Sequence, residues 1–308
     1  MDVLIVGSLA YDSLETPVGS VDCELGGSAS YGGFSASFHN KKNDGNGVGL
    51  VGVIGQDFRQ QHLDWYKKSG LDITGIEVGE GETFRWRGSY HGSMADAVTH
   101  ETHLNVFENF QPKVPDSQKN AKVLMCANLH PSLQSSVIAQ TNIERISILD
   151  SMNLWIEIAN DELKEVMKKV DILILNDSEV RMLAGEDNLI LAAKAVLGMK
   201  NGGILVVKKG ENGVIALHPD GLISMPSYPT SNLVDPTGCG DSFAGSMAQY
   251  LSIKSGIVSK EELAESLVHA TVTASFTIES FGTERIRKLS VDEYEARLLE
   301  YRSITKTS

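Results

Sequence analysis

The sequence predicts an α/β protein, with a doubly wound three-layer α/β/α fold, a mainly parallel central sheet and a small β lid. Short apolar runs recur along the chain, each ends in polar or glycine residues, and stretches with helical spacing lie between many of them. Because strands alternate with helices, we expect parallel strands covered by helices on both faces. Two stretches, residues 11–25 and 81–110, lack a helical period and break this alternation.

Six apolar runs are predicted to be strands buried on both faces of the sheet. The first has no basic flank before it and no small-residue cleavage site after it, so it indicates a strand and not a signal peptide. The six runs are Val3–Val6, Val48–Ile54, Val123–Cys126, Ile146–Leu149, Ile172–Leu175 and Ile204–Val207.

Apolar residues spaced three or four apart predict helices between these strands. Such spacing covers Asp161–Val170 and Leu189–Met199, and Val291–Tyr301 is predicted as a final amphipathic helix. Ser259, followed three residues later by Glu262, is typical of a helix start.

The two irregular stretches predict an accessory sheet that forms the lid. Side chains of residues 81–110 alternate, as on a strand, so that aromatic residues share one face and polar residues the other. The aromatic side chains either pack onto the domain or a second subunit, which we favour, or stack on a sugar or nucleobase. The aromatic face holds Phe84, Trp86 and Tyr90, and the polar face holds Thr83, Arg85, Arg87 and Ser89.

Composition limits the partners of the protein. With 27 Lys and Arg against 40 Asp and Glu, the formal charge is −13, which repels nucleic acid and anionic membranes. Cys23, Cys126 and Cys239 are odd in number and far apart, which predicts reduced thiols in the cytoplasm. No apolar run reaches the length of a membrane span. The 308 residues are interpreted as one domain.

The stretch "LVDPTGCGDSFAGSMAQYL", residues 233–251, carries the most chemistry. Gly238 and Gly240 permit a turn that gathers main-chain amides, and a helix is predicted from Asp241. Amides at the positive end of a helix bind anions, which an acidic protein needs in order to hold phosphate. Asp241 is either a general base for an acceptor hydroxyl or a cap of the helix.

These residues resemble a signature of the PfkB or ribokinase-like family of small-molecule kinases, Asp-Thr-x-Gly-Ala-Gly-Asp. Here it reads Asp235-Pro236-Thr237-Gly238-Cys239-Gly240-Asp241, with Pro236 and Cys239 as the two departures. The resemblance implies that the amides of Gly238, Cys239 and Gly240 form the anion hole for the transferred phosphoryl group. It also implies that Asp241 is the catalytic base.

Further residues resemble positions of the family's motifs and occur in the same order, so that the resemblance spans roughly residues 3–290. The resemblance implies that these residues bind the acceptor, magnesium and the nucleotide. They are Asp12, Gly26 and Gly27 for the acceptor; Asn176 and Glu179 for magnesium and phosphate; Lys208, Gly210 and Gly213 on the nucleotide side; and Ser275 and Gly282 in the segment that resembles the adenine-pocket lining.

Several positions bear on the acceptor. Tyr31 stands where ribokinase-like members often carry Asn, so a contact to a sugar hydroxyl is altered, and Ala10 replaces another Asn. Asn105, Asn128 and Asp150 end or follow predicted strands and either reach the acceptor or serve as turn and cap residues, which we favour.

Three other signals are given little weight. "GVGLVG", residues 47–52, lacks the strand before it and the helix after it that a dinucleotide site needs. "HETH", residues 100–103, has no third metal ligand and is interpreted as a solvated part of the lid. Cys239 is interpreted as a small residue filling the place of Ala and not as a reactive thiol.

The prediction is therefore an ATP-dependent kinase that uses Mg²⁺ and phosphorylates a hydroxyl of a sugar or sugar-like molecule. A nucleoside kinase of the same family is the first alternative, and a catalytically silent nucleotide-binding homologue is the second. A monovalent cation as activator and a homodimer through the lid stay open.

Overall fold

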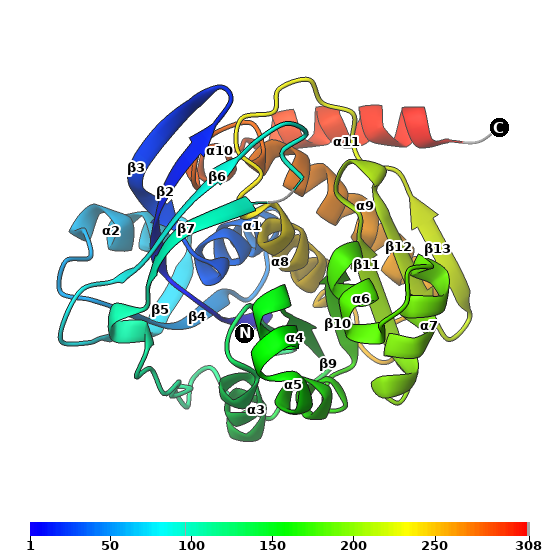
Figure 1. Ribbon diagram of the computed structural model, residues 1–308, viewed down its shortest axis with the longest axis horizontal. Helices are drawn as coiled ribbons and strands as arrows, with labels where there is room; N and C mark the ends of the chain where they lie inside the picture. Colours follow the sequence, from blue (N-terminus) through cyan, green and yellow to red (C-terminus); the bar gives the residue numbers. More distant parts are fainter. Residues whose placement is uncertain (96, 307–308) are drawn as a thin grey trace.

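The computed structural model describes residues 1–95 and 97–306, and these form two sheets with helices around the larger one (Figure 1). The large sheet has nine strands in the order β13-β12-β11-β10-β9-β8-β1-β4-β5, and the small sheet has the order β3-β2-β6-β7. In the large sheet all neighbours pair in parallel except β11 with β12 and β12 with β13.

The bounds of the elements are as follows. The large sheet contains β1 (Val3–Val6), β4 (Val48–Ile54), β5 (Leu71–Val78), β8 (Val123–Cys126), β9 (Ile146–Asp150), β10 (Ile172–Asn176), β11 (Ile204–Lys208), β12 (Val214–His218) and β13 (Gly221–Met225). The small sheet contains β2 (Ala10–Thr16), β3 (Gly19–Gly26), β6 (Phe84–Tyr90) and β7 (Ala97–His103). The helices are α1 (Ser28–Lys42), α2 (Gln60–Lys68), α3 (Pro131–Gln140), α4 (Asn153–Ile158), α5 (Asn160–Met167), α6 (Asp177–Ala184), α7 (Leu189–Met199), α8 (Cys239–Leu251), α9 (Lys260–Thr277), α10 (Glu284–Arg287) and α11 (Val291–Thr305), with single 3₁₀ turns at Asn105–Phe107 and Gly210–Asn212.

Alternate residues of each central strand enter different hydrophobic cores, which makes the protein three-layered. Val3 and Ile5 of β1 pack on the face covered by α1, α2, α8, α9 and α11. Leu4 and Val6 pack on the other face, covered by α3 to α7. Because both faces are buried, these strands are apolar without alternation, as the sequence analysis expected.

The small sheet projects from the large one as the lid, at the upper left of Figure 1. β2 pairs in antiparallel fashion with β3 and in parallel with β6. Its inner side chains form a separate small core of Leu14, Tyr90 and Met94, with Trp86 packed against it.

The predicted α/β fold with its small second sheet, the six strands and the final helix are confirmed. The strands of the small sheet lie within residues 10–26 and 84–103, and the bounds 11–25 and 81–110 of a lid stay a prediction. The helix predicted from Asp241 begins two residues earlier, at Cys239, because Gly238 rather than Asp241 is its N-cap. No helix in the described part of the chain is long and apolar enough to cross a membrane.

Candidate functional site

The glycine bend at residues 235–241 lies at the N-terminus of α8, in the middle of the molecule (Figure 1). Gly238 has φ 74°, a left-handed conformation that glycine adopts without strain. Residues 236–241 all keep partial solvent access, so the bend is not sealed under side chains. The amides of a helix N-terminus are therefore available to an anion.

Asp241 is partly exposed. Burial, and to a smaller extent the neighbouring Asp150 carboxylate, raises its pKa to about 7, although the charge of Lys208 acts to lower it. A carboxyl group with such a pKa exchanges its proton near neutral pH, as a general base must. Asp241 is not the N-cap, so the alternative capping role does not apply.

Asp12 is on β2, on the inner side of the lid, and only 4% of it is exposed. Burial raises the pKa of Asp12 to about 8, and the nearby carboxylates of Asp235 and Asp241 raise it too, while a hydrogen bond from the Gly27 amide lowers it. A side chain on Gly26 would overlap the Asp12 carboxylate. Gly26 thus leaves room for that carboxylate, whereas a side chain on Gly27 would meet the backbone of Ser8 and Ala10.

Tyr31 of α1 packs its ring on Gly238, because any side chain at Gly238 would overlap that ring. The Tyr31 hydroxyl is buried and has no hydrogen-bond partner among the described residues. Burial raises the pKa of Tyr31 well above its usual value, with the charges of Asp235 and Asp12 adding to the effect. Tyr31 therefore places a polar group without a hydrogen-bond partner within reach of the charges of Asp235 and Asp12.

Asn176 and Glu179 form a reciprocal cap at the start of α6. The Glu179 amide donates to Asn176 Oδ1 and the Asn176 amide donates to Glu179 Oε2, each at 2.7 Å. Asn176 Oδ1 also accepts from Ser178 Oγ, whereas Glu179 Oε1 has no partner in the described part of the chain. Burial raises the pKa of Glu179 to about 7.

Lys208, at the end of β11, lies beside the bend. Its Nζ is 3.0 Å from the point that a Cβ on Gly240 would occupy. Lys208 also pairs with Asp150 at the end of β9, with Nζ 3.0 Å from Oδ2. The pKa of Lys208 is raised: burial acts to lower it, but the carboxylates of Asp150, Glu179 and Asp241 outweigh that effect.

Asp150, for which a turn or cap role was favoured, accepts a hydrogen bond from the Ser151 amide at 3.0 Å and in addition belongs to this charged cluster. The position at the carboxyl end of a parallel strand was the available signal, because such ends gather the functional groups of α/β sheets.

The remaining nucleotide-side residues lie on different elements. Gly210 and Gly213 flank the turn after β11 with φ 53° and 83°, and a side chain at Gly213 would overlap the backbone at Met225. The Gly282 amide donates to Asp235 Oδ2 at 3.2 Å, which ties its loop to the bend. Ser275 is buried on α9, and its hydroxyl donates to the Val272 carbonyl.

Asn105 and Asn128 both have structural contacts. Asn105 Nδ2 donates to the Thr83 carbonyl at 2.9 Å, at the base of the lid. Asn128 Oδ1 accepts from Trp155 Nε1 at 2.8 Å. Both side chains therefore join distant segments of the chain, and the turn and cap roles favoured for them stay a prediction.

The inner aromatic residues of the lid contact the domain, as the favoured interpretation expected. Tyr90 accepts a hydrogen bond from Thr237 at 3.2 Å, and Trp86 belongs to the same small core as Leu14. Phe84 instead stacks on Phe107, with ring centroids 5.3 Å apart.

The signals given little weight fall into structural roles. The "GVGLVG" stretch leads into and forms β4, residues 100–103 lie on exposed β7, and burial raises the pKa of the Cys239 thiol, which keeps it unreactive. The described residues contain no cluster of three or more His, Cys, Asp or Glu side chains that could hold a metal ion.

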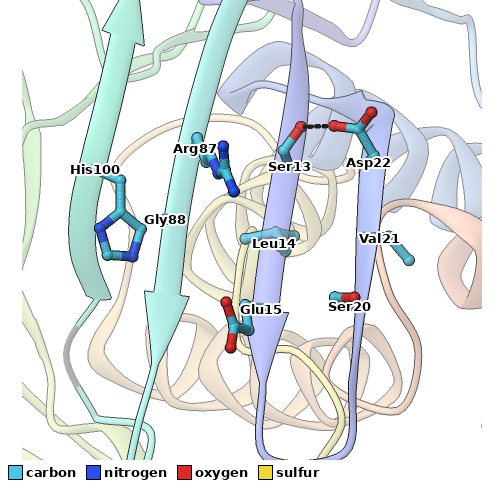
Figure 2. A pocket seen from close by; sticks show the side chains of 9 residues that line it. All are labelled: Ser13, Leu14, Glu15, Ser20, Val21, Asp22, Arg87, Gly88 and His100. Atoms are coloured by element: carbon cyan, nitrogen blue, oxygen red, sulfur yellow. Dashed lines mark hydrogen bonds between the residues drawn. The ribbon is translucent and has the colours of Figure 1, made fainter.

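The outer face of the lid sheet carries an open hollow of about 700 Å³ (Figure 2). Ser13 and Asp22 are hydrogen bonded across it, and Glu15 and Arg87 also line it. Ser13 and Glu15 alternate along β2 with Asp12 and therefore face away from the acceptor carboxylate. No residue of the glycine bend lines this hollow.

Comparison with known proteins shows to which family the chain belongs. A family model described as pfkB family carbohydrate kinase matches residues 30–288. The chain belongs to this family. The signature bend and the capped Asn176–Glu179 pair both fall within the matched segment. The curated relatives that the chain resembles are named as kinases.

Among those relatives, a cytidine kinase of Thermococcus kodakarensis is 28% identical over 250 residues, which cover 80% of this chain and 86% of the relative. A fructokinase-2 of rice is 27% identical over 246 residues, covering 71% of this chain and 69% of the relative.

Solved structures share the fold of this family member. A nucleoside kinase of Methanocaldococcus jannaschii has a TM-score of 0.76 at 18% identity, covering 97% of this chain and 99% of that chain. A nucleoside kinase of Burkholderia thailandensis in complex with inosine has a TM-score of 0.77 at 18% identity, covering 97% of each chain. A ribokinase of Thermotoga maritima reaches 0.73 at 19% identity, covering 97% and 99%.

Proposed function

We propose that this sugar or nucleoside kinase transfers the terminal phosphoryl group of ATP to a hydroxyl group that Asp12 orients and Asp241 deprotonates. The observation that carries the proposal is the partly open bend at residues 236–241, with its helix N-terminus and the partly exposed Asp241, whose carboxyl group has a raised pKa. Phosphoryl transfer depends on positioning and on neutralising charge, and the bend supplies both with backbone amides.

The steps follow from the positions of these groups. The amides of Gly238, Cys239 and Gly240 hold the transferred group at the positive end of α8. Asp241 takes the proton of the acceptor hydroxyl as the oxygen attacks phosphorus. The lid, closed by the hydrogen bond between Tyr90 and Thr237, excludes water as a competing acceptor. Lys208, Gly210, Gly213, Ser275 and Gly282 are proposed to serve the nucleotide.

Of the two residues predicted to bind magnesium, Glu179 is suited to the ion and Asn176 is not. Glu179 Oε1 is free to bind a hard cation directly or through water, whereas Asn176 Oδ1 already accepts two hydrogen bonds. We therefore assign Glu179 to the ion and Asn176 to holding Glu179 in place. Bound magnesium would neutralise phosphate charge.

A sugar hydroxyl is our first acceptor, and a nucleoside is the second. The nucleoside is supported by the relation to a cytidine kinase and by the aromatic Trp86 on the inner side of the lid. Tyr31, where ribokinase-like members often carry Asn, argues against ribose as the acceptor.

A panel tests the acceptor class. Purified protein with ATP and Mg²⁺ is incubated with pentoses, hexoses and nucleosides, and ADP formation and the phosphorylated product are measured. Turnover of a pentose or hexose supports the first acceptor, and turnover of nucleosides alone selects the second. Absence of transfer to every compound, with ATP binding intact, would select a catalytically silent homologue.

Further parts of the proposal concern the setting of the enzyme. One kinase domain working in the cytoplasm accords with the reduced cysteines. The charged outer hollow of the lid, with Arg87 beside Glu15 and Asp22, offers both signs of charge to a second copy, and a homodimer through the lid is proposed there. A monovalent cation near Asp235 is proposed as an activator.

A further inference from the structure

Asp150 and Lys208 form a largely buried ion pair at the carboxyl end of the large sheet, across the strand β10. Asp150 ends β9 and Lys208 ends β11, and β10 lies between the two strands. Lys208 Nζ donates to both Asp150 oxygens, at 3.0 and 3.2 Å. The side chains are 19% exposed for Lys208 and 5% exposed for Asp150, so water competes little for this pair.

The ammonium group is also held against the phosphoryl-binding bend. Nζ is 3.0 Å from the Cβ position of Gly240, so a side chain at this position would push the ammonium group away by a few tenths of an ångström. An ammonium group has three donors, and Asp150 accepts two of them. One donor stays free for an anion bound at the Gly240 amide.

Lys208 has two other carboxylates within its electrostatic reach, those of Glu179 and Asp241. Lysine side chains are flexible, so without Asp150 the ammonium group would turn toward one of them. A pair with Asp241 would occupy the base, and a pair with Glu179 would occupy the oxygen assigned to magnesium. Asp150 prevents both arrangements.

We propose that Asp150 is a positioning residue that acts through Lys208, holding Nζ beside Gly240 where it contacts the terminal phosphoryl group of ATP. The inference rests on the proposed function, and it deepens it by adding a residue that the family signature does not contain. Asp150 itself touches neither substrate.

A double-mutant cycle tests the dependence of Asp150 on Lys208. Phosphoryl transfer is measured for the wild type, Asp150→Asn, Lys208→Met and the double variant, with the acceptor that the panel identifies. We expect kcat of Asp150→Asn to be about 10- to 100-fold lower than that of the wild type. The double variant should have a kcat less than about 2-fold lower than that of Lys208→Met alone. An equal loss in both backgrounds, or no loss in the wild type, would overturn the proposal.

Nucleotide affinity provides a readout without turnover. Calorimetry compares ADP with a non-hydrolysable imido analogue of ATP, both with Mg²⁺. We expect Asp150→Asn to weaken the analogue about 10-fold and ADP less than about 2-fold, because only the analogue carries the terminal phosphoryl group. Equal weakening of both nucleotides would contradict a contact to that group.

The Arg145–Glu262 pair is the matched control, since both of its side chains are 3% exposed and it joins other elements. Glu262→Gln should lower thermal stability and leave kcat unchanged; a kcat loss equal to that of Asp150→Asn would overturn the proposal.

If Asp150→Asn does not fold, Asp150→Glu replaces it, and an unchanged kcat and analogue affinity of that variant would refute the positioning role. A wild type that binds neither nucleotide refutes the proposed function itself, and this inference with it.

Discussion

Burial raises the pKa of Asp12, and the nearby charges of Asp235 and Asp241 raise it too. Burial is also the largest cause of the raised pKa values of Asp235 and Asp241, so all three carboxyl groups favour the protonated form more than an exposed carboxyl group does. The pKa values are about 8 for Asp12 and about 7 for Asp241, so both groups exchange a proton near neutral pH. Their positions differ, since Asp12 is on β2 and Asp241 is in the first turn of α8, and we expect the first to orient a hydroxyl and the second to accept its proton.

The base assignment predicts the behaviour of Asp241→Asn. The amide has nearly the same shape but cannot accept the proton, so kcat should fall about 10²- to 10⁴-fold. Affinities for ATP and the acceptor, measured by calorimetry, should change little. A variant that retains full phosphoryl transfer would show that Asp241 is not the base.

The buried Asp12 carboxyl group predicts a pH-dependent cost to stability. Its pKa is about 8 in the folded protein and near the usual 3.8 when unfolded, so between these values the folded state binds more protons. The free energy of unfolding should therefore fall as pH rises from about 4 to about 8. Asp12→Asn has no such proton to lose. The melting temperature of the variant minus that of the wild type should therefore become larger from pH 5 to pH 8. Binding of the acceptor should be lost. A difference that stays constant with pH would contradict the assignment.

The bend predicts that Gly238 is more sensitive to substitution than glycines of similar conformation. Gly238 and Gly256 have φ 74° and 78°, but a Cβ overlaps the Tyr31 ring at the former and meets open space at the latter. Gly256→Ala should cost about 1 kcal/mol from its backbone conformation alone. Gly238→Ala should cost more and abolish transfer, as chemical denaturation and activity assays would show. Equal losses of stability would mean that the Tyr31 ring moves freely.

At the scale of elements, the lid is fixed at its base by one carboxylate. Asp57 Oδ1 accepts from the Thr83 amide and hydroxyl, each at 2.7 Å, and Oδ2 pairs with Arg85 at 2.7 Å. Arg85 also lies over the Tyr11 ring. The strand β6 therefore starts from a rigid support, which sets the position of Tyr90 over the bend.

Asp57→Asn should loosen this support. We expect the acceptor KM to rise about 10-fold and ATP hydrolysis without acceptor to increase, because a loose lid admits water. Melting temperature should fall only slightly, since the large core is untouched. The exposed pair Asp116–Lys119 provides the control, and Asp116→Asn should change neither KM nor hydrolysis. An unchanged acceptor KM in Asp57→Asn would refute the anchoring role.

The elements differ in how far the sequence predicts them. Both faces of β1, β4 and β8 to β11 are buried, which leaves unbroken apolar runs that are readily recognised. Helix α1 was not predicted: it carries Gly32 and Gly33 and is buried on almost every side, so it has no polar face to reveal a helical period. Gly32 lies close to the backbone of α8, a contact between distant segments that no local pattern encodes.

The site shows the same division. The bend and the Asn176–Glu179 cap are local in sequence, so their residues could be named in advance. The Asp150–Lys208 pair joins residues 58 positions apart across β10. Its formation depends on the strand order of the sheet, which one sequence does not specify.

On the scale of the whole molecule, the formal charge of −13 opposes the binding of an anionic nucleotide. The Lys208 ammonium group and the N-terminus of α8 offset this repulsion only at short range. Long-range repulsion is screened by salt, with a Debye length of about 10 Å at 0.1 M, whereas the buried short-range contacts are screened much less.

Salt should therefore improve nucleotide binding, opposite to the usual effect on oppositely charged partners. Raising ionic strength from about 0.02 to about 0.2 M should lower the KM for MgATP severalfold and leave the KM of an uncharged acceptor unchanged. Tetramethylammonium chloride is the appropriate salt, because a large organic cation does not replace a potassium or sodium ion that activates the enzyme. A KM for MgATP that rises with this salt would mean that a positive local field around Lys208 dominates the approach of the nucleotide, and that the overall charge has no influence on it.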